Sequence, residues 1–224
     1  MARLPRLTLP GHGHYVRQES VHGQALAADA QDVAHLLGSM RELSAAYEVA
    51  VWAYAILPDA LECVLCPATD AGLGRFMQAL GRRYVQSFNR RHGRHGALWA
   101  GRFRAALVED GEWMLTSMIR TELQARAHGS PSSEAHHAGQ IRDPLLAEPA
   151  AYWALGNTPF ERELAWRQRL ADGIDPAVES VLARAVHGAW VVGSPAFAES
   201  VAAASGRPAR PRPAGRPRRP METE

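Results

Sequence analysis

Two apolar runs on either side of Pro58 and Asp59 constrain the fold of this chain more than any other feature of its sequence. The first run, EVAVWAYAIL at residues 48–57, is rich in β-branched and aromatic residues, which favour a buried strand. Proline followed by aspartate is typical of a turn, and residues 61–66 return as a second strand. The sequence therefore predicts an antiparallel hairpin in the first half of the chain.

Helical and extended patterns alternate around this hairpin. Behind Asp29, a candidate helix N-cap, apolar residues recur at helical spacing. The order strand, helix, strand, strand, helix, strand, helix predicts an α+β fold, a ferredoxin-like split βαβ unit with an antiparallel sheet, helices on one of its faces and one appended helix. The expected elements besides the hairpin are strands at residues 14–18 and 102–108 and helices at 29–47, 73–88 and 111–127.

Beyond the appended helix the composition changes twice. The stretch HGSPSSEAHHAGQ is polar, and from Gly206 onward the chain alternates arginine with proline and glycine, a composition that cannot pack a core. The expected parts are a first domain at residues 1–128, a linker at 129–142, a helical C-terminal region at 143–205 and a disordered basic tail at 206–224.

Capping signals mark two helices within the C-terminal region. Thr158, Pro159 and Glu161 form the pattern of a capping box with proline at the first helical position. Gly173 predicts the end of that helix. Ser194, which also precedes a proline, predicts the start of a last short helix.

Positive charge is concentrated in two segments of the chain. The formal net charge is only +2, and all 25 basic residues are arginines. Residues 71–108 contain eight arginines and no acid, and residues 206–220 contain six more, again without an acid. Two cationic segments on an otherwise acidic chain imply a polyanionic partner.

The cysteines and the apolar pattern bear on the compartment. Cys63 and Cys66 lie three residues apart on an expected strand, so their side chains point to opposite faces, and we expect small buried thiols rather than a metal or redox pair. No run approaches the roughly 20 apolar residues that cross a bilayer. Prolines and a histidine interrupt the N-terminal stretch where a signal peptide would lie. We therefore expect a cytoplasmic protein with no membrane role.

Several blocks of the first 128 residues occur together in one known family. The chain carries LPGHGHYV near its N-terminus, AYAILPD in the expected hairpin, and RFMQALGRRYVQSFNRRHGRHGALWAGRFRAALV at residues 75–108. In these blocks it resembles the REP-associated tyrosine transposases, a branch of the single-tyrosine HUH transposases of mobile elements. The stretch from residue 143 and the Arg/Pro tail are similar to the C-terminal extension of many members. The resemblance implies DNA transposition, DNA recombination and a possible homodimer.

The same resemblance implies a catalytic centre whose residues are replaced in this chain. Members hold a divalent metal with two histidines, spaced His-hydrophobic-His on one strand, and attack the DNA with a tyrosine on the helix after the fourth strand. The matching positions here are Ala60 and Glu62 for the histidines and Arg120 for the tyrosine. We therefore expect no catalytic residue and no cofactor, with Mg²⁺ required only if activity survives. Glu62 is a weak candidate metal ligand, and the simpler expectation is a solvated acid beside an empty pocket.

The basic segments supply the candidate DNA contacts. Eight arginines without an acid on one helix and the adjoining loop exceed what a solvated surface requires, so we favour phosphate contacts. Aromatic stacking normally accompanies such a groove when it binds single strands. The tail motif AGRPRRP resembles an AT-hook without its first arginine. The predicted DNA-binding residues are Arg82, Arg83, Arg90, Arg91, Arg94, Trp99, Arg102, Phe103, Arg104, Arg216, Arg218 and Arg219.

Two further residues have competing interpretations. Tyr84 is the only tyrosine in the basic segment, but it shares the apolar stripe of its helix, which favours core packing over a substitute nucleophile. His14 matches a family position on the first strand, where it could face the old catalytic site.

The sequence thus predicts a transposase-family protein that binds single-stranded or hairpin DNA without cleaving it. One alternative is an active DNA-strand-transferring transposase with an unconventional site. The other is a regulatory or protein-interaction module on a ferredoxin-like scaffold.

Overall fold

The first part of the molecule follows the element order that the sequence predicts. The computed structural model describes residues 7–211 of the 224-residue chain. Its elements up to residue 128 are β1 (Gly13–Glu19), a 3₁₀ turn η1 (Val21–Gly23), α1 (Ala30–Ala46), β2 (Val49–Ile56), β3 (Ala60–Pro67), α2 (Gly72–Arg91), β4 (Arg104–Val108) and α3 (Glu112–His128).

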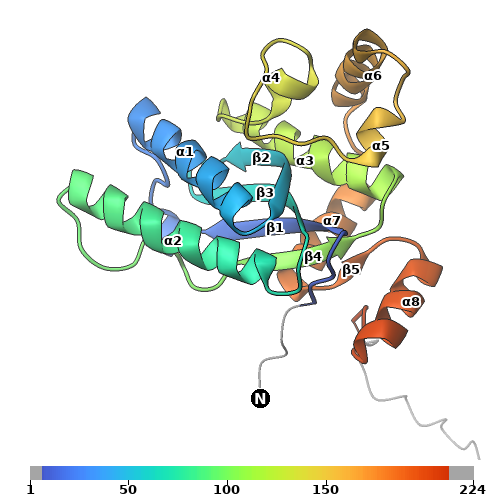
Figure 1. The fold of residues 1–224 in the computed structure, drawn as a ribbon, viewed down its shortest axis with the longest axis horizontal. Helices are drawn as coiled ribbons and strands as arrows, with labels where there is room; N and C mark the ends of the chain where they lie inside the picture. The colour runs from blue at the N-terminus through green and yellow to red at the C-terminus, as the bar shows by residue number, and fades with distance from the viewer. Residues whose placement is uncertain (1–6, 212–224) are drawn as a thin grey trace, which may run out of the picture.

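A single mixed sheet organises the fold (Figure 1). With a short strand β5 (Val191–Val192), its strand order is β2-β3-β1-β4-β5. The first four strands are antiparallel to their neighbours, whereas β5 pairs in parallel with β4. The predicted hairpin is the β2–β3 pair, and the ferredoxin-like α+β prediction is confirmed.

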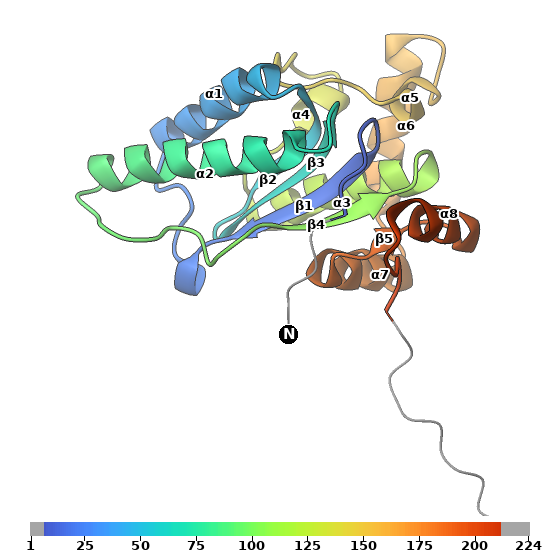
Figure 2. The same cartoon turned by 60° about the horizontal axis from the view of Figure 1, so that its bottom comes forward.

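The two helices of the split βαβ unit lie together on one face of the sheet, as Figure 2 shows. The carboxylate of Asp29 caps α1 by accepting hydrogen bonds from the backbone N–H groups of Gln31 (2.9 Å) and Asp32 (3.1 Å). Burial of apolar surface along α2 then fixes that helix against the sheet, because its apolar residues recur every three or four positions. The fully or nearly buried residues of α2 are Gly72, Leu73, Phe76, Met77, Leu80, Tyr84 and Phe88.

The opposite face of the sheet is covered by α3 and by helices from the C-terminal part. These are α6 (Pro159–Asp172) and α7 (Pro176–Gly188). Trp166 of α6 and Leu182 of α7 are fully buried in one core with Tyr15 of β1 and Val64 of β3. Of these two helices, α7 therefore packs onto the sheet itself, and α6 packs against α3.

The predicted caps of the C-terminal helices are present. The Thr158 hydroxyl accepts from the Glu161 backbone N–H (3.2 Å), and the Glu161 carboxylate accepts from that of Thr158 (3.0 Å). Gly173 follows the last residue of α6. Ser194 caps α8 (Pro195–Ser205), the last helix of the described range. No helix within residues 7–211 is long and apolar enough to cross a membrane.

Residues 129–142 pack differently from the polar linker that their composition predicts. They include a short helix, α4 (Glu134–His137), and α5 (Ala150–Trp153) follows shortly after them. Ser133 and His137 are buried, and both lie 2.6 Å from Oε1 of Glu122 on α3. The segment is thus held to the body of the molecule by buried polar contacts.

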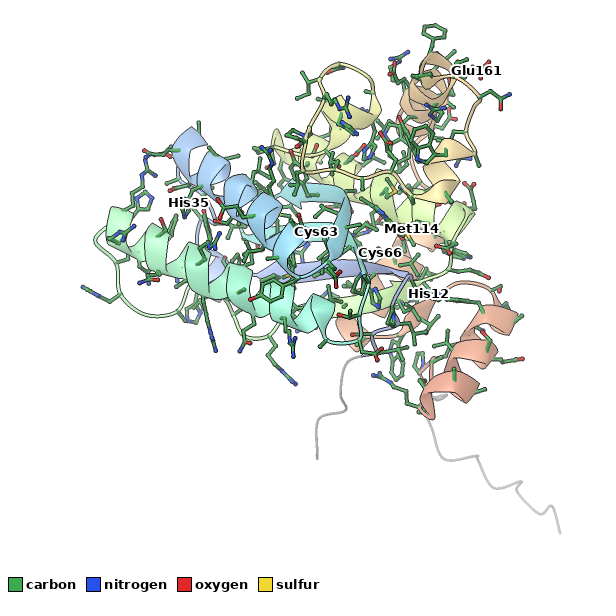
Figure 3. All side chains as sticks on the ribbon, in the orientation of Figure 1. His12, His35, Cys63, Cys66, Met114 and Glu161 are labelled. Carbon is green, nitrogen blue, oxygen red and sulfur yellow. The ribbon has the colours of Figure 1, made fainter. Side chains whose placement is uncertain are left out.

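The two cysteines, labelled in Figure 3, are three residues apart on β3 and therefore lie on its opposite faces. Cys63 is buried in the core between the sheet and the α1–α2 layer, whereas Cys66 is only half-buried. Burial raises the pKa of the Cys66 thiol to about 11, which keeps it protonated at neutral pH. Both thiols are free.

Candidate nucleic-acid interface

The structure brings together the two main positions at which the family resemblance implies catalytic residues. Glu62 on β3 and Arg120 on α3 form an ion pair, with 3.2 Å between Nη1 of Arg120 and Oε2 of Glu62. The Glu62 side chain is 0% exposed and that of Arg120 is 8% exposed. The expectation of a solvated acid beside an empty pocket is therefore wrong, because Arg120 reaches across from α3 and pairs with the buried acid.

Three further side chains complete this buried polar cluster. Tyr15 and Arg17 of β1 lie on the same sheet face as Glu62; the Tyr15 hydroxyl donates to Oε2 of Glu62 (2.5 Å), and Arg17 bonds to Oε1. Arg120 also pairs with Glu179 of α7 at 2.8 Å. Burial raises the pKa of Glu62 to about 7, and the charge of Arg17 opposes that shift. The cluster ties β1, β3, α3 and α7 together.

This donor set does not fit the divalent metal that the fold family implies. Ala60 is fully buried in an apolar contact with Ala55, Leu57 and Ala125, and it offers no side-chain ligand. Both oxygens of Glu62 already accept hydrogen bonds, and two guanidinium groups would repel a cation there. Residues 7–211 contain no group of three or more His, Cys, Asp or Glu side chains placed to hold a metal ion.

The surroundings of Tyr84 and His14 decide between their competing interpretations. Tyr84 is fully buried and its hydroxyl donates to the backbone carbonyl of Leu26 (2.7 Å), which confirms core packing. His14 alternates with Tyr15 along β1, so it lies on the sheet face away from Glu62 and not beside it. Its Nε2 accepts from the Leu9 backbone N–H (3.3 Å), and burial lowers the pKa of His14 to about 4.

The cationic surface of α2 and the following loop contains four arginines that we call the free arginines. Each is exposed, and within residues 7–211 none of them forms a hydrogen bond or an ion pair through its side chain. Three lie on α2, within about 80° of one another around the helix and spread over about 22 Å of its axis. The free arginines are Arg75, Arg82, Arg90 and Arg102.

The other arginines of this segment are already engaged inside the protein. Arg83 pairs with Glu42 of α1 at 2.5 Å, and Arg91 pairs at 2.5 Å with both Asp29 and Asp32. These contacts depend on tertiary packing between α1 and α2. Arg94 bonds to the amide oxygen of Gln24, and Arg104 lies 2.7 Å from Nδ1 of His187. The structure thus divides the arginines of this segment into internally paired residues and free arginines, a division that the sequence does not show.

The two candidate stacking residues also differ. Trp99 is partly exposed and lines a hollow between α2 and the loop at residues 99–103, whereas Phe103 is only 8% exposed and belongs to the core. The hollow has a volume of about 460 Å³ and also contains Arg82 and Arg102. Arg216, Arg218 and Arg219 lie outside the described residues.

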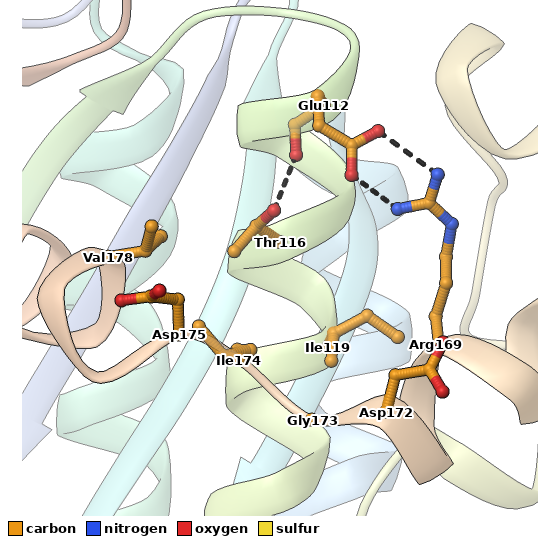
Figure 4. A pocket seen from close by; sticks show the side chains of 9 residues that line it. All are labelled: Glu112, Thr116, Ile119, Arg169, Asp172, Gly173, Ile174, Asp175 and Val178. Atoms are coloured by element: carbon orange, nitrogen blue, oxygen red, sulfur yellow. Dashed lines mark hydrogen bonds and ion pairs between the residues drawn. The ribbon is translucent and has the colours of Figure 1, made fainter.

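A second hollow, between α3 and the connection from α6 to α7, has the opposite character (Figure 4). It encloses about 320 Å³ and is lined by Glu112, Asp172 and Asp175. Its one arginine, Arg169, bonds through both terminal nitrogens to the carboxylate of Glu112. An acidic hollow whose only cation is already paired does not suit a phosphate.

Sequence reasoning missed three members of the buried cluster. Tyr15 and Arg17 alternate on β1, and only the strand register, which pairs Arg17 with Glu62, shows that they face the acid. Glu179 lies on α7, a helix that is absent from the predicted elements. A period-two pattern could have placed Tyr15 and Arg17 on one face of β1. No local signal in the sequence links β1 or β3 to α7.

The fold and the site define a ferredoxin-like α+β protein with a row of free arginines beside a sheet whose other face carries a buried ion-pair cluster. Its fold is shared with the solved structure of a REP-associated tyrosine transposase bound to a REP hairpin: the TM-score is 0.53 and the identity 11%, over 67% of this chain and 93% of that one. A structure from Deinococcus radiodurans R1, assigned as a transposase, matches with a TM-score of 0.36 and 17% identity over 49% of this chain and 88% of its own. No family model and no curated protein matches the sequence.

Proposed function

We propose that this protein binds hairpin or single-stranded DNA through the free arginines and neither cuts nor rejoins it. The observation that carries the proposal is on α2, where three exposed arginines that have no side-chain partner within residues 7–211 share one side of the helix. Their spread of about 22 Å corresponds to the rise of about six base pairs. The shared fold with a transposase that was solved bound to a DNA hairpin supports a nucleic-acid ligand over other polyanions.

The buried cluster supports the second half of the proposal. Cleavage by this fold family needs a nucleophile that forms a covalent bond to the DNA, and the guanidinium group at position 120 cannot form one. Its partner Glu62 is enclosed by Arg17, Arg120 and Tyr15, so a scissile phosphate would have to displace three side chains to reach it. We propose that Mg²⁺ plays no part in binding.

Salt dependence of binding tests the role of the free arginines. Each phosphate contact contributes about −0.9 to the slope of log K against log salt on duplex DNA. Arg82 and Arg83 are adjacent in sequence, but only Arg83 is neutralised by an acid, Glu42. We therefore expect Arg82→Ala to reduce the magnitude of the slope by about 0.9 on a hairpin probe. Arg83→Ala is the matched control and should leave it nearly unchanged.

Two results would contradict this proposal. A salt-independent affinity of the unmodified protein would mean that phosphates are not its ligand. Equal effects of the two substitutions would mean that internal pairing does not decide which arginines contact DNA, and the interface would then lie elsewhere.

A further inference from the structure

Exposed apolar side chains are concentrated in one stretch of the C-terminal part. Of the five large apolar residues that are exposed within residues 7–211, four lie between positions 141 and 164: Ile141, Trp153, Phe160 and Leu164. Phe160 is 67% exposed and Leu164 is 52% exposed, and the two are neighbours on one side of α6 because they are four residues apart. Adjacent apolar side chains that face solvent mark an interaction surface.

The outward side of α6 has the repeat of a helix that packs against another helix. Exposed residues recur there at spacings of four, three and four, which are the a and d positions of a heptad. We call these residues the α6 seam, and they are Phe160, Leu164, Arg167 and Ala171. The other side of α6 already buries Trp166 and Leu170 in the core beside α3. The helix thus has two apolar sides, and the rest of the described chain covers only one of them.

Two opposite charges accompany the apolar residues of the seam. Glu163 and Arg167 are four residues apart on α6, a spacing that allows an ion pair, but no ion pair joins them. Arg167 instead donates through Nη1 to the carbonyl of Ala138 (2.6 Å), which does not neutralise its charge. Glu163 forms no hydrogen bond or ion pair within residues 7–211. Both charges therefore remain available to a partner.

This pattern is complementary to itself when a second α6 runs in the opposite direction. A two-fold axis at the middle of the helix, between positions 165 and 166, places the Phe160 ring opposite the small Ala171 of the partner subunit. The same axis places Leu164 opposite the partner's Arg167, whose guanidinium group then lies beside Glu163 on the same flank. Symmetry forms that ion pair twice. A parallel arrangement would instead set like charges against each other.

We propose that the α6 seam is a homodimer interface in which α6 packs antiparallel against α6 of a second copy. The seam is about 21 Å long and one helix wide, less than the roughly 800 Å² per partner of a stable interface, so the dimer forms in a concentration-dependent way. Helix α6 packs on α3, across the sheet from α2, so each copy keeps its free arginines exposed. The inference does not depend on the proposed function.

The first test measures the molar mass of the full-length protein between about 1 and 100 μM, by sedimentation or by light scattering. We expect the unmodified protein to pass from monomer to dimer within this range. Leu164→Glu places a charge at the centre of the seam and should keep the protein monomeric throughout. Val181→Glu is the matched control, because Val181 is an exposed apolar residue of α7 outside the seam, and it should dimerise as the unmodified protein does.

The second test exchanges the charges. Glu163→Arg alone and Arg167→Glu alone each set like charges together at both symmetric contacts, so each should raise the dimer dissociation constant at least tenfold. An equimolar mixture of the two variants joins opposite charges at both contacts and should regain the affinity of the unmodified protein. Such recovery also shows that both variants are folded.

Three results would overturn the inference. A protein that stayed monomeric at 100 μM would show that the seam does not pair with itself. Unchanged dimerisation of Leu164→Glu would place the interface elsewhere. A mixture of the two charge variants that did not recover dimerisation would rule out the antiparallel arrangement. DNA binding by the unmodified protein is measured separately, so any of these results would leave the proposed function standing.

Discussion

At the scale of single residues, the burial of Arg120 has a structural consequence. A buried arginine needs compensating charge, and here Glu62 and Glu179 supply it from two different elements. Such a pair is costly to assemble, but removing one partner leaves the other charge buried and alone. The acid at position 62 and the arginine at position 120 therefore depend on each other.

Arg120→Ala tests this dependence through its response to pH. Burial places the pKa of Glu62 at about 7, above its ordinary value of 4.5, so the folded state holds that proton more tightly than the unfolded state does. The stability from this group is complete below pH 4.5 and is lost as the pH rises through 7. Removing the charge of Arg120, which lies 3.2 Å from Glu62, favours the protonated acid, and it therefore deepens the loss of stability at high pH.

We expect Arg120→Ala to lower the free energy of unfolding by about 3 kcal/mol at pH 8 and by clearly less at pH 5, as measured by urea denaturation. Arg126→Ala is the control on the same helix, because Arg126 forms an exposed pair with Glu134 and should cost under about 1 kcal/mol at either pH. A loss for Arg120→Ala that was equal at both pH values would show that the ionisation of Glu62 does not govern the cluster.

At the scale of secondary-structure elements, α2 shows what a sequence can and cannot specify. Its apolar period predicts the helix and its buried side, and Tyr84 falls on that side as expected. The pairing of Arg83 with Glu42 depends on how α1 lies beside α2, which is a tertiary fact. The arginine positions could therefore be predicted, but not which of them stay free.

The segment at residues 129–142 illustrates the same limit. Its polar composition predicts a solvated linker, yet its serine and histidine side chains bond to a buried glutamate of α3. Glu122 accepts through Oε1 from Ser133 (2.6 Å), contacts His137 Nδ1 at the same distance, and accepts through Oε2 from the Trp166 indole (2.8 Å). The carboxyl group of Glu122 thus connects α3 to α4 and to α6.

Glu122→Gln should loosen this segment and α6 together. The amide group would place N–H donors against at least one existing donor, so we expect the free energy of unfolding to fall by about 3 kcal/mol. Glu199→Gln is the control, since Glu199 is an exposed residue of α8 without a side-chain partner in the described range, and it should change stability by less than about 0.5 kcal/mol. If Glu122→Gln unfolded at the same urea concentration as the unmodified protein, these contacts would contribute nothing to stability.

At the scale of the whole molecule, the C-terminal part helps to cover the sheet face that carries Glu62. Helices α3, α6 and α7 cover the face on which Glu62 lies, and Glu179 of α7 bonds directly into the cluster. The ferredoxin-like order could be predicted because each element carries its own local period. The docking of α7 and the parallel pairing of β5 could not, because both depend on contacts between residues more than 50 positions apart.

Homodimerisation stays a prediction. The outer edge of β2 is already covered by the chain that follows α3, through bridges between Val51 and Leu146 and between Ala55 and Ser132. Covered strand edges do not pair readily with a second copy. A sheet-to-sheet dimer through this edge would have to displace that segment.

The central claim is that this scaffold binds DNA without breaking it, and one measurement tests it most directly. The purified protein is incubated with Mg²⁺ and a labelled hairpin that carries an unpaired 5′ tail, and the products are separated under native and denaturing conditions. We predict a shifted complex on the native gel and only intact, free DNA on the denaturing gel. A labelled oligonucleotide that remained attached to the denatured protein would contradict the account.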